Sequence, residues 1–332
     1  MLNIFRIKQA VCAAGIAVLT SANLASAQEM KLADWLSPQH PYQEQVYGVL
    51  ASKIAQATNG DVTIQIYPGG ALGGNPTEQY DRALNGVAEI AFGLPGYTAS
   101  KFPMTLMTEL PGVIDEAEAT QKIWDNVEFI QDEFKRVHLL SIWTNGENVL
   151  YTRDKPVRNL SDVAGMKIRV PSRNAGMVVE SWGAVPVSMP VPEVYNAMQT
   201  GVIDAILIDS TATYAFRFGE VANYVTAGMN GSISPFALYM NRDAYGDLSD
   251  AHKAAFDQAG REVSLIGNAV QLAGVARGKQ MFQEMDGKEW IDLTPEAAAE
   301  FDAASASVIE TVVAAAEAEG LNARAFVEAL QE

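Results

Sequence analysis

The residue types that most often do chemistry are few in this chain and lie far apart in the sequence. Its three histidines, His40, His138 and His252, match no spacing known for metal ligands. No G-x-S-x-G sequence is present, so the chain lacks the turn that exposes a serine nucleophile in α/β-hydrolases. Asp204 and Asp209 bracket one apolar strand, where we expect two separate carboxylates rather than a catalytic pair. These patterns support neither an enzyme nor a metal or cofactor site.

A glycine-rich loop, "PGGALGGNP" at 68–76, is the segment that most resembles a phosphate-binding loop. Such loops end in Gly-Lys-Ser/Thr or follow the pattern G-x-G-x-x-G, and this loop does neither. It follows a predicted strand and precedes a predicted helix. We therefore interpret it as a turn between the two.

The stretch "MKIRVPS" at 166–172 contains an arginine in an otherwise unremarkable short strand. Apolar and charged residues alternate through it, and Pro171 ends the run. Alternation alone would place Arg169 beside Lys167 on a solvated face. The strand by itself leaves open whether Arg169 is solvated or directed at a ligand.

Aromatic residues stand at the ends of three predicted strands. Trp35 ends the first strand, Phe92 the third, and Trp143 the strand before "TNGEN". In open α/β sheets, ligands bind outside the carboxyl ends of the strands. One tryptophan at such a place is more often core than ligand contact, but several at corresponding ends make the two interpretations about equal.

The elements that would position these residues alternate between strands and helices. Strands are predicted at 30–36, 62–67, 87–92, 137–143, 149–153, 166–170, 185–189, 202–208 and 236–240. Helices are predicted at 42–58, 77–86, 115–137, 173–182, 191–200, 249–284, 295–319 and 322–331. This alternation predicts an α/β fold with largely parallel sheets. Two such sets predict two lobes with a cleft between them, and a chain that crosses between the lobes more than once.

The first 27 residues have the features of a secretory signal peptide. Arg6 and Lys8 precede an apolar segment, 11–20, that is too short to span a bilayer, and Ala25-Ser26-Ala27 fits a cleavage site. The only cysteine, Cys12, lies in this peptide, so the mature chain is expected to have no disulfide, thiol nucleophile or cysteine metal site.

Charge excludes two classes of partner. The 332 residues carry a formal net charge of −17, which repels nucleic acid and anionic lipid surfaces. After residue 27, no segment is long and apolar enough to cross a membrane.

A central segment resembles the solute-binding proteins of TRAP transporters, the DctP family. It reads "KPVRNLSDVAGMKIRVPSRNAGMVVESWGAVPVSMPVPEVYNAMQTGVIDA" at 155–205. "LSPQHPY" at 36–42, "YPGGALGG" at 67–74 and "YMNRDAYGDLS" at 239–249 resemble the same family. The resemblance implies a two-lobed periplasmic-binding-protein architecture with a ligand cleft and a long helix spanning both lobes. It also implies a periplasmic receptor, cleaved near Ala27, that delivers a small organic solute to membrane permease subunits driven by an ion gradient.

The same resemblance suggests how the chain divides. After a signal peptide at 1–27, residues 28–148 and about 238–277 would form lobe I, and residues 149–237 and about 278–332 would form lobe II. A monomer is expected.

The resemblance also gives Arg169 a role, because the family's nearly universal ligand contact is the arginine of this "KIRVP" position. It would form a two-pronged salt bridge with a ligand carboxylate, a geometry that suits the planar guanidinium fork. The family pattern places these further residues at or near the ligand: Asp34, Trp35, Phe92, Leu94, Tyr97, Trp143, Asn145, Asn148, Met189, Ile208 and Asp209.

One departure from the family pattern limits which solutes we expect this chain to bind. Some members bind dicarboxylates or sialic acid with a second arginine near the position of Val149 in this chain. One arginine suggests one carboxylate, and the aromatic residues at strand ends would cover an apolar or cationic body. Asp34 or Asp209 would pair with an amine or hydroxyl. Amino-acid-like and betaine-like solutes, hydroxy acids and keto acids all remain open.

Two alternative functions remain. A receptor of the same architecture would serve an ATP-driven transporter or a sensor kinase. A secreted hydrolase would use Asp209 and a histidine. We expect no catalysis, no metal and no cofactor.

Overall fold

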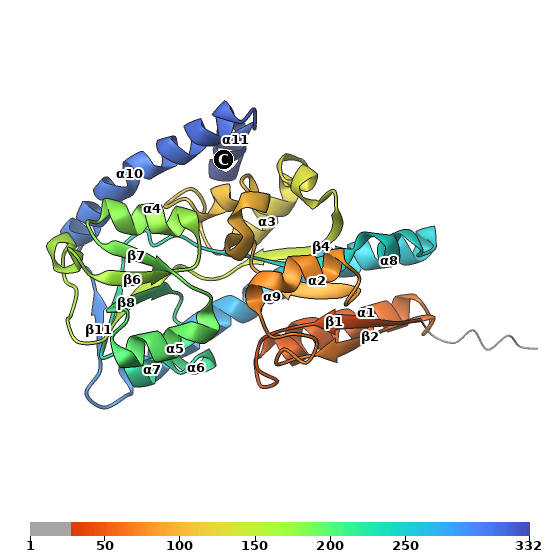
Figure 1. Cartoon of the computed structure of the whole chain (residues 1–332), viewed down its shortest axis with the longest axis horizontal. Helices are drawn as coiled ribbons and strands as arrows, with labels where there is room; N and C mark the ends of the chain where they lie inside the picture. The colour runs from red at the N-terminus through yellow and green to blue at the C-terminus, as the bar shows by residue number, and fades with distance from the viewer. Residues whose placement is uncertain (1–27) are drawn as a thin grey trace, which may run out of the picture.

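The strands form two sheets, one in each lobe. A computed structural model of the protein describes residues 28–332, so the predicted signal peptide and Cys12 lie outside the described residues. The strands are β1 Gln28–Ala33, β2 Val62–Tyr67, β3 Ile90–Gly93, β4 Val137–Thr144, β5 Val149–Thr152, β6 Lys167–Val170, β7 Val185–Ser188, β8 Ala205–Ile208, β9 Tyr224–Ala227, β10 Pro235–Asn241 and β11 Glu289–Asp292. Lobe I is built on the sheet β2-β1-β3-β10-β4, and lobe II on the sheet β11-β9-β5-β8-β6-β7 (Figure 1). The predicted two-lobed α/β architecture is confirmed.

Helices flank both sheets. They are α1 Val49–Ala57, α2 Gln79–Leu84, α3 Ala119–Asp125, α4 Arg173–Ser181, α5 Val191–Thr200, α6 Ala212–Ala215, α7 Phe218–Val221, α8 Arg242–Gly246, α9 Asp250–Gln283, α10 Pro295–Ala318 and α11 Ala323–Gln331. Local chemistry sets several ends: Ser172 and Ser249 accept a backbone N–H at the starts of α4 and α9, and Gly201 ends α5 at φ 78°. The predicted helices 173–182, 191–200 and 249–284 are therefore confirmed to within a residue or two.

The sheets are more mixed than predicted. Within residues 28–332, five strand pairs are parallel and four are antiparallel. The antiparallel pairs all involve β10 or β5, the strands that enter directly from the other lobe. A parallel pair needs a crossover connection, usually a helix, and these two crossings have none. The prediction of largely parallel sheets is wrong for this reason.

The predicted helix at 115–137 is broken in the structure. Only α3 is α-helical there, and short 3₁₀ turns follow at Val127–Phe129 and Gln131–Phe134. Where α3 ends, the Asn126 side chain donates to the carbonyl of Lys122, which also accepts the backbone N–H of Asn126. Apolar residues three or four apart become buried in either conformation, so the spacing could not distinguish the two.

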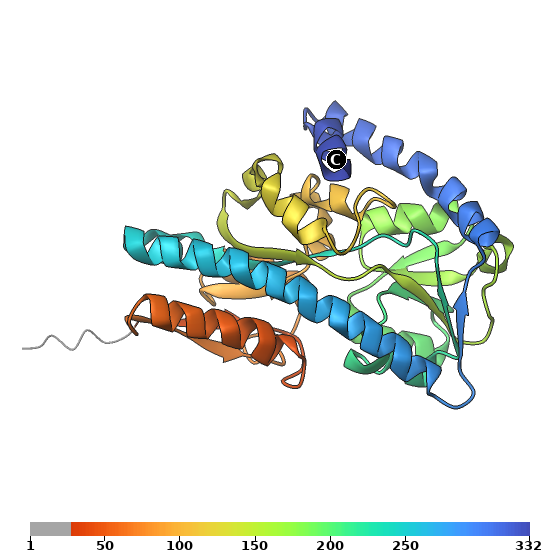
Figure 2. The same ribbon diagram turned by 180° about the vertical axis from the view of Figure 1, so that it is seen from behind.

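One helix, α9, runs across both lobes (Figure 2). It packs on α1 and β4 in lobe I and on α6 and β11 in lobe II. Glycines allow backbone contact at both ends: a Cβ at Gly260 would lie 2.0 Å from the Leu140 carbonyl oxygen, and one at Gly278 would lie 1.8 Å from that of Ser210. The predicted long helix spanning both lobes is confirmed.

The C-terminal segment contacts both lobes. Helix α10 packs on α4 of lobe II, whereas α11 packs on α3 of lobe I (Figure 1). Next to the second contact, Phe326 of α11 stacks on Phe129, in the 3₁₀ turn after α3, with ring centroids 5.2 Å apart. The residue boundaries proposed for the lobes remain a prediction. No helix within residues 28–332 combines the length and the hydropathy that crossing a membrane requires.

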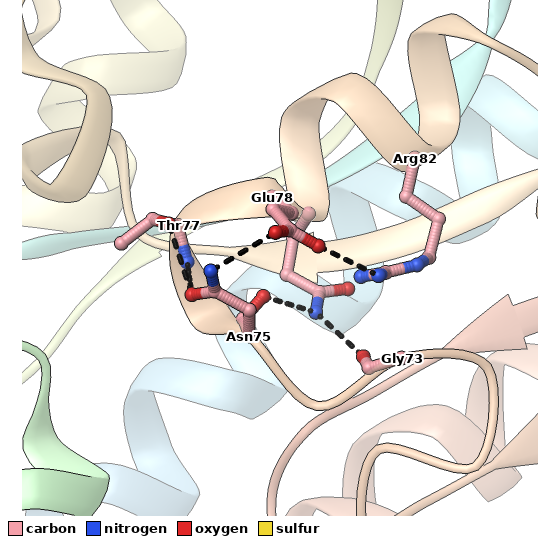
Figure 3. Close-up of polar contacts among 6 residues, drawn as sticks. Gly73, Asn75, Thr77, Glu78 and Arg82 are labelled. Carbon is pink, nitrogen blue, oxygen red and sulfur yellow. Dashed lines mark hydrogen bonds and ion pairs between the residues drawn. The ribbon is translucent and has the colours of Figure 1, made fainter.

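The glycine-rich loop is closed by side chains of the segment that follows it (Figure 3). Gln79 Nε2 donates to the carbonyl oxygens of Asn75 at 3.1 Å and Gly73 at 3.4 Å. Arg82 pairs with Glu78 at 3.4 Å, and its guanidinium fills the space that a Cβ at Gly73 would need. The loop is a turn between β2 and α2, as the sequence predicts.

Candidate functional site

A cavity lies between the two lobes, where the ends of strands from both sheets meet. Its empty volume, which includes space open to solvent, is about 530 Å³. Of the predicted site residues, these line it: Trp35, Phe92, Leu94, Tyr97, Asn145, Asn148, Arg169, Ile208 and Asp209. The structure thus brings residues at or near the ends of β1, β3, β4, β5, β6 and β8 to one place.

Arg169 is the only Lys or Arg that lines the cavity within residues 28–332, and it is buried with 1% of its surface exposed. Its Nε donates to the Met189 carbonyl at 3.0 Å, and its Nη1 and Nη2 donate to the Leu207 carbonyl at 3.4 Å and the Tyr97 hydroxyl at 3.3 Å. In the described chain, no carboxylate contacts it. Burial lowers the pKa of Arg169, and the neighbouring Tyr97 opposes that shift. The site therefore holds a buried cation on neutral acceptors, without an anionic partner.

Tyr97 links Arg169 to the opposite lobe. It lies on the 3₁₀ segment Pro95–Lys101, which follows β3 of lobe I. Its hydroxyl accepts from Arg169 and also from the backbone N–H of Val191, at 3.0 Å, at the start of α5 in lobe II. Arg169 is thus placed where the two lobes meet.

Asp209 lies just beyond β8 and is held by donors. Its Oδ1 accepts from the backbone N–H of Thr211 at 2.9 Å and from the Thr211 hydroxyl at 2.5 Å. Its Oδ2 accepts from Asn145 Nδ2 at 2.9 Å. Burial raises the pKa of Asp209, and these hydrogen bonds act in the opposite direction. Asp209 contacts no histidine within residues 28–332, so the arrangement does not favour the hydrolase alternative.

The amide of Asn145 joins this carboxylate to the segments that cross between the lobes. Its Oδ1 accepts from the backbone N–H of Ser234, which leaves Nδ2 to donate to Asp209 and, at 3.0 Å, to Asn148 Oδ1. Asn148 Nδ2 then donates to Ser232 at 3.2 Å. The Asn145 amide is therefore oriented by a backbone group that cannot reverse its role.

A chain of hydrogen bonds leads from Trp143 to the carboxylate of Asp209. Trp143 Nε1 donates to Tyr42 Oη at 3.0 Å, and Tyr42 Oη donates to Gln271 Oε1 at 2.5 Å. Gln271 Nε2 donates to the Thr211 hydroxyl at 3.3 Å, and that hydroxyl donates to Asp209. The chain begins at an indole, which can only donate, and each later bond also runs toward Asp209.

Aromatic rings form the walls of the cavity. Trp35 at the end of β1 stacks on Phe92 at 6.1 Å and, across to lobe II, on Phe216 at 6.4 Å with an interplanar angle of 12°. Phe236, near the start of β10, packs against Phe92 at 5.7 Å. Flat apolar walls of this kind suit a planar or ring-shaped body.

Three predicted site residues do not line the cavity. Asp34 is buried behind it, where it accepts from Leu36 N at 3.0 Å and Gln43 Nε2 at 2.5 Å, and burial raises its pKa to about 7. Trp143 has no exposed surface and orients Tyr42. Met189 contributes its backbone carbonyl to Arg169.

Several lining residues were missed: His40, Tyr42, Thr211, Phe216, Phe236 and Gln271. His40 accepts the backbone N–H of Tyr42 on Nδ1, and burial lowers its pKa to about 4, so its neutral ring carries the proton on Nε2. A signal for Gln271 existed, because Ser264, Asn268 and Gln271 place buried polar groups along the face of α9 that carries its glycines. Nothing in the sequence marked Phe216.

The other histidines lie outside the cavity. His138 pairs with Asp257 at 3.0 Å, and His252 approaches Asp61 at 3.9 Å. Within residues 28–332, no group of three or more His, Cys, Asp or Glu side chains is arranged to hold a metal ion.

A buried carboxyl, Glu109, joins the lobes beside the cavity. It lies in the 3₁₀ segment Thr105–Glu109 of lobe I and accepts from the hydroxyl of Ser172, the cap of α4 in lobe II, at 2.5 Å. Burial raises the pKa of Glu109 to about 8, and hydrogen bonds from Ser172 and Ser234 oppose the shift. The folded protein therefore keeps this proton at a pH where the unfolded chain has lost it.

This shift predicts that Glu109 makes the protein less stable as pH rises from about 4.5 to about 8. Glu109→Gln should have the same free energy of unfolding as the parent protein near pH 5 and a higher one at pH 8, because the amide does not titrate. Urea unfolding at both pH values measures the difference. Exposed Glu300→Gln is the matched control and should change neither curve. Equal losses of stability with pH in the parent and the Gln variant would contradict the assignment.

A family model and individual relatives both identify the chain as similar to bacterial solute-binding proteins. The model described as bacterial extracellular solute-binding protein, family 7 (DctP) matches residues 32–316. The ectoine/5-hydroxyectoine-binding periplasmic protein of Ruegeria pomeroyi is 30% identical over 253 residues, 72% of this chain and 71% of that protein. The chain covers a smaller share, 54% and 59%, of two other curated relatives, from Albidiferax ferrireducens and Salmonella typhimurium.

Solved structures agree with the fold. A TRAP solute-binding protein from Rhodoferax ferrireducens, in complex with copurified benzoate, is 27% identical with a TM-score of 0.85, covering 91% of this chain and 96% of that one. A marine metagenome TRAP solute-binding protein from an unidentified microbe, described as specific for aromatic acid ligands, was solved with 3-hydroxybenzoate. It is 25% identical with a TM-score of 0.85, covering 92% of this chain and 98% of that one.

Proposed function

The chain belongs to bacterial extracellular solute-binding protein family 7, the DctP family of TRAP transporters, and we propose that it captures a small organic monocarboxylate with a ring-shaped body. Proteins of this family bind small organic ligands and work with membrane permease subunits. By this proposal, the chain is exported to the periplasm, loses its signal peptide near Ala27, and delivers its solute to a TRAP permease as a monomer.

The observation that carries the proposal is Arg169. A guanidinium taken out of water and held only by neutral acceptors is costly unless a bound anion completes the site. Two parallel N–H donors match the two oxygens of a carboxylate. Since Arg169 is the only cationic side chain lining the cavity within residues 28–332, and Val149 is packed in the core of lobe II, one carboxylate is expected rather than two.

The shape of the cavity supports a ring-shaped body. Trp35, Phe92 and Phe236 line it with apolar faces. Two similar proteins were solved with benzoate and 3-hydroxybenzoate, and a relative is named for ectoine binding. All three ligands are cyclic monocarboxylates.

Binding would be transmitted by closure of the lobes. A solute held by Arg169 of lobe II and by aromatic rings of lobe I stabilises the closed state, and the permease would read that state. The known relatives are receptors, which is consistent with a chain that binds its solute without converting it.

A thermal-shift screen tests the proposal. We expect benzoate, 3-hydroxybenzoate, cyclohexanecarboxylate or another cyclic monocarboxylate to raise the melting temperature by several degrees, since a ligand at about 100 times its Kd adds about 2.7 kcal/mol of stability. Benzamide and other neutral amides of the same rings serve as controls and should have no effect. Stabilisation by dicarboxylates alone would show that the single-arginine argument is wrong.

A further inference from the structure

The cavity contains a buried acid as well as a buried base. Arg169 and Asp209 both line it, at 1% and 3% exposure, yet they form no ion pair with each other. Within residues 28–332, Arg169 contacts no carboxylate and Asp209 contacts no Lys, Arg or His. Two buried groups of opposite formal charge therefore share one site without neutralising one another.

The contacts of Asp209 define what it offers to a ligand. The atoms in close hydrogen bonds to its side chain are all donors, namely Thr211 N, the Thr211 hydroxyl and Asn145 Nδ2. The Gln271 amide, also a donor, lies near the carboxylate as well. The Asn145 amide cannot reverse, because its Oδ1 is occupied by Ser234 N–H, and the Thr211 hydroxyl also accepts from Gln271 Nε2. Burial raises the pKa of Asp209, and the surrounding donors oppose that shift by favouring the ionised form.

One acceptor position on Asp209 is left unfilled. A carboxylate offers about four lone-pair positions, and the three hydrogen bonds leave one of those on Oδ2. Because Asp209 lines the cavity, that position is available to a ligand. Its chemical complement is an N–H or O–H donor, and a cationic nitrogen also supplies the missing counter-charge.

We propose that the solute is a zwitterion, with its carboxylate on Arg169 and a protonated ring or side-chain nitrogen that donates to Asp209. A zwitterion leaves the occupied cavity without net charge, whereas a simple anion would leave Asp209 as an unpaired negative charge. Because Arg169 and Asp209 do not touch, the nitrogen belongs on the part of the body away from the carboxylate. This inference rests on the proposed function, since it assumes that Arg169 holds the acid end.

The test uses ligands that differ by one ring atom. Isonipecotate and nipecotate carry a ring NH₂⁺ where cyclohexanecarboxylate carries CH₂, and pipecolate places the nitrogen beside the carboxylate. Isothermal titration of the intact mature protein should show isonipecotate or nipecotate binding about 10-fold or more tightly than cyclohexanecarboxylate, as expected for a hydrogen bond between charged groups.

Asp209→Asn provides the second arm, because it keeps the shape and removes the charge. It should abolish the preference for the piperidine acids over cyclohexanecarboxylate, so the ratio of the two affinities within the variant is the quantity to compare. Asp204→Asn, at the other end of β8, is the matched control and should retain the preference. The comparison in the parent protein needs no variant, so misfolding of Asp209→Asn would not remove the test.

The outcomes separate the two proposals. Equal or tighter binding of cyclohexanecarboxylate by the parent protein would overturn the zwitterion inference and leave the carboxylate function standing. A preference that survives Asp209→Asn in a folded variant would also overturn it. Failure of every carboxylate to bind would overturn both.

Discussion

Arg169→Met should abolish detectable solute binding, with a loss of affinity on the order of 100-fold or more, because it removes both prongs of the carboxylate contact. The empty protein should remain folded and be no less stable, because the substitution removes a buried charge that has no anionic partner while keeping most of the side-chain volume. Titration with the best ligand from the thermal-shift screen, together with urea unfolding of the empty protein, measures both effects.

Two further variants make the result specific. Arg169→Lys retains the charge but loses the planar fork, so it should recover only a minor part of the affinity. Exposed Arg173→Met, four residues further along, makes the same chemical change outside the cavity and should bind normally. Unchanged affinity in a folded Arg169→Met protein would remove Arg169 from the site.

Gly278→Ala should lower the free energy of unfolding by about 3 kcal/mol, a large effect for the addition of one methyl group. In an exposed helix the same change stabilises, because alanine is favoured over glycine by about 1 kcal/mol. Here the new Cβ would lie 1.8 Å from the backbone oxygen of Ser210, so α9 or the segment after β8 must move. That segment contains Asp209 and Thr211, so solute affinity should fall as well.

Matched glycines separate the two effects. Gly260→Ala meets the Leu140 oxygen at 2.0 Å in lobe I and should destabilise the protein without a comparable loss of affinity in the molecules that remain folded. Gly246→Ala in α8 meets no atom within 4 Å and should be neutral or stabilising. Unfolding curves of the three variants measure the loss of stability, and ligand titrations measure the loss of affinity. A Gly278→Ala protein as stable as its parent would contradict the packing.

Much of the architecture could be predicted because local patterns and long-range packing agree there. Helix α9 has a serine cap and a long segment without proline, and it was predicted nearly to the residue. The segment at 115–137 could not be predicted, because its apolar spacing continues past Asn126, where α3 ends. The directions of β5 and β10 depend on where the chain crosses between the lobes. No local sequence pattern predicts where these crossings occur.

Some residues of the candidate site could be predicted from the sequence, and others could not. Residues at strand ends, such as Phe92 and Asp209, could be placed because parallel strands bring their carboxyl ends together. Asp34 and Trp143 also stand near strand ends, yet they support the cavity from behind. The sequence could not show which of two adjacent side chains faces the solute. Phe216 follows α6 and Gln271 lies in α9, so neither is near a strand end. Only the structure shows that they line the cavity.

The glycines of α9 have a consequence for how this protein tolerates mutation. Mutational scans usually associate intolerance with large buried side chains, whose loss leaves a cavity. In α9, Gly260 and Gly278 have no side chain to lose, yet each occupies a point where two backbones touch. We expect a deep mutational scan to find every substitution at these two positions depleted, while most exposed positions between them accept many residues. The positions of α9 that tolerate the fewest substitutions would thus be those occupied by residues without a side chain.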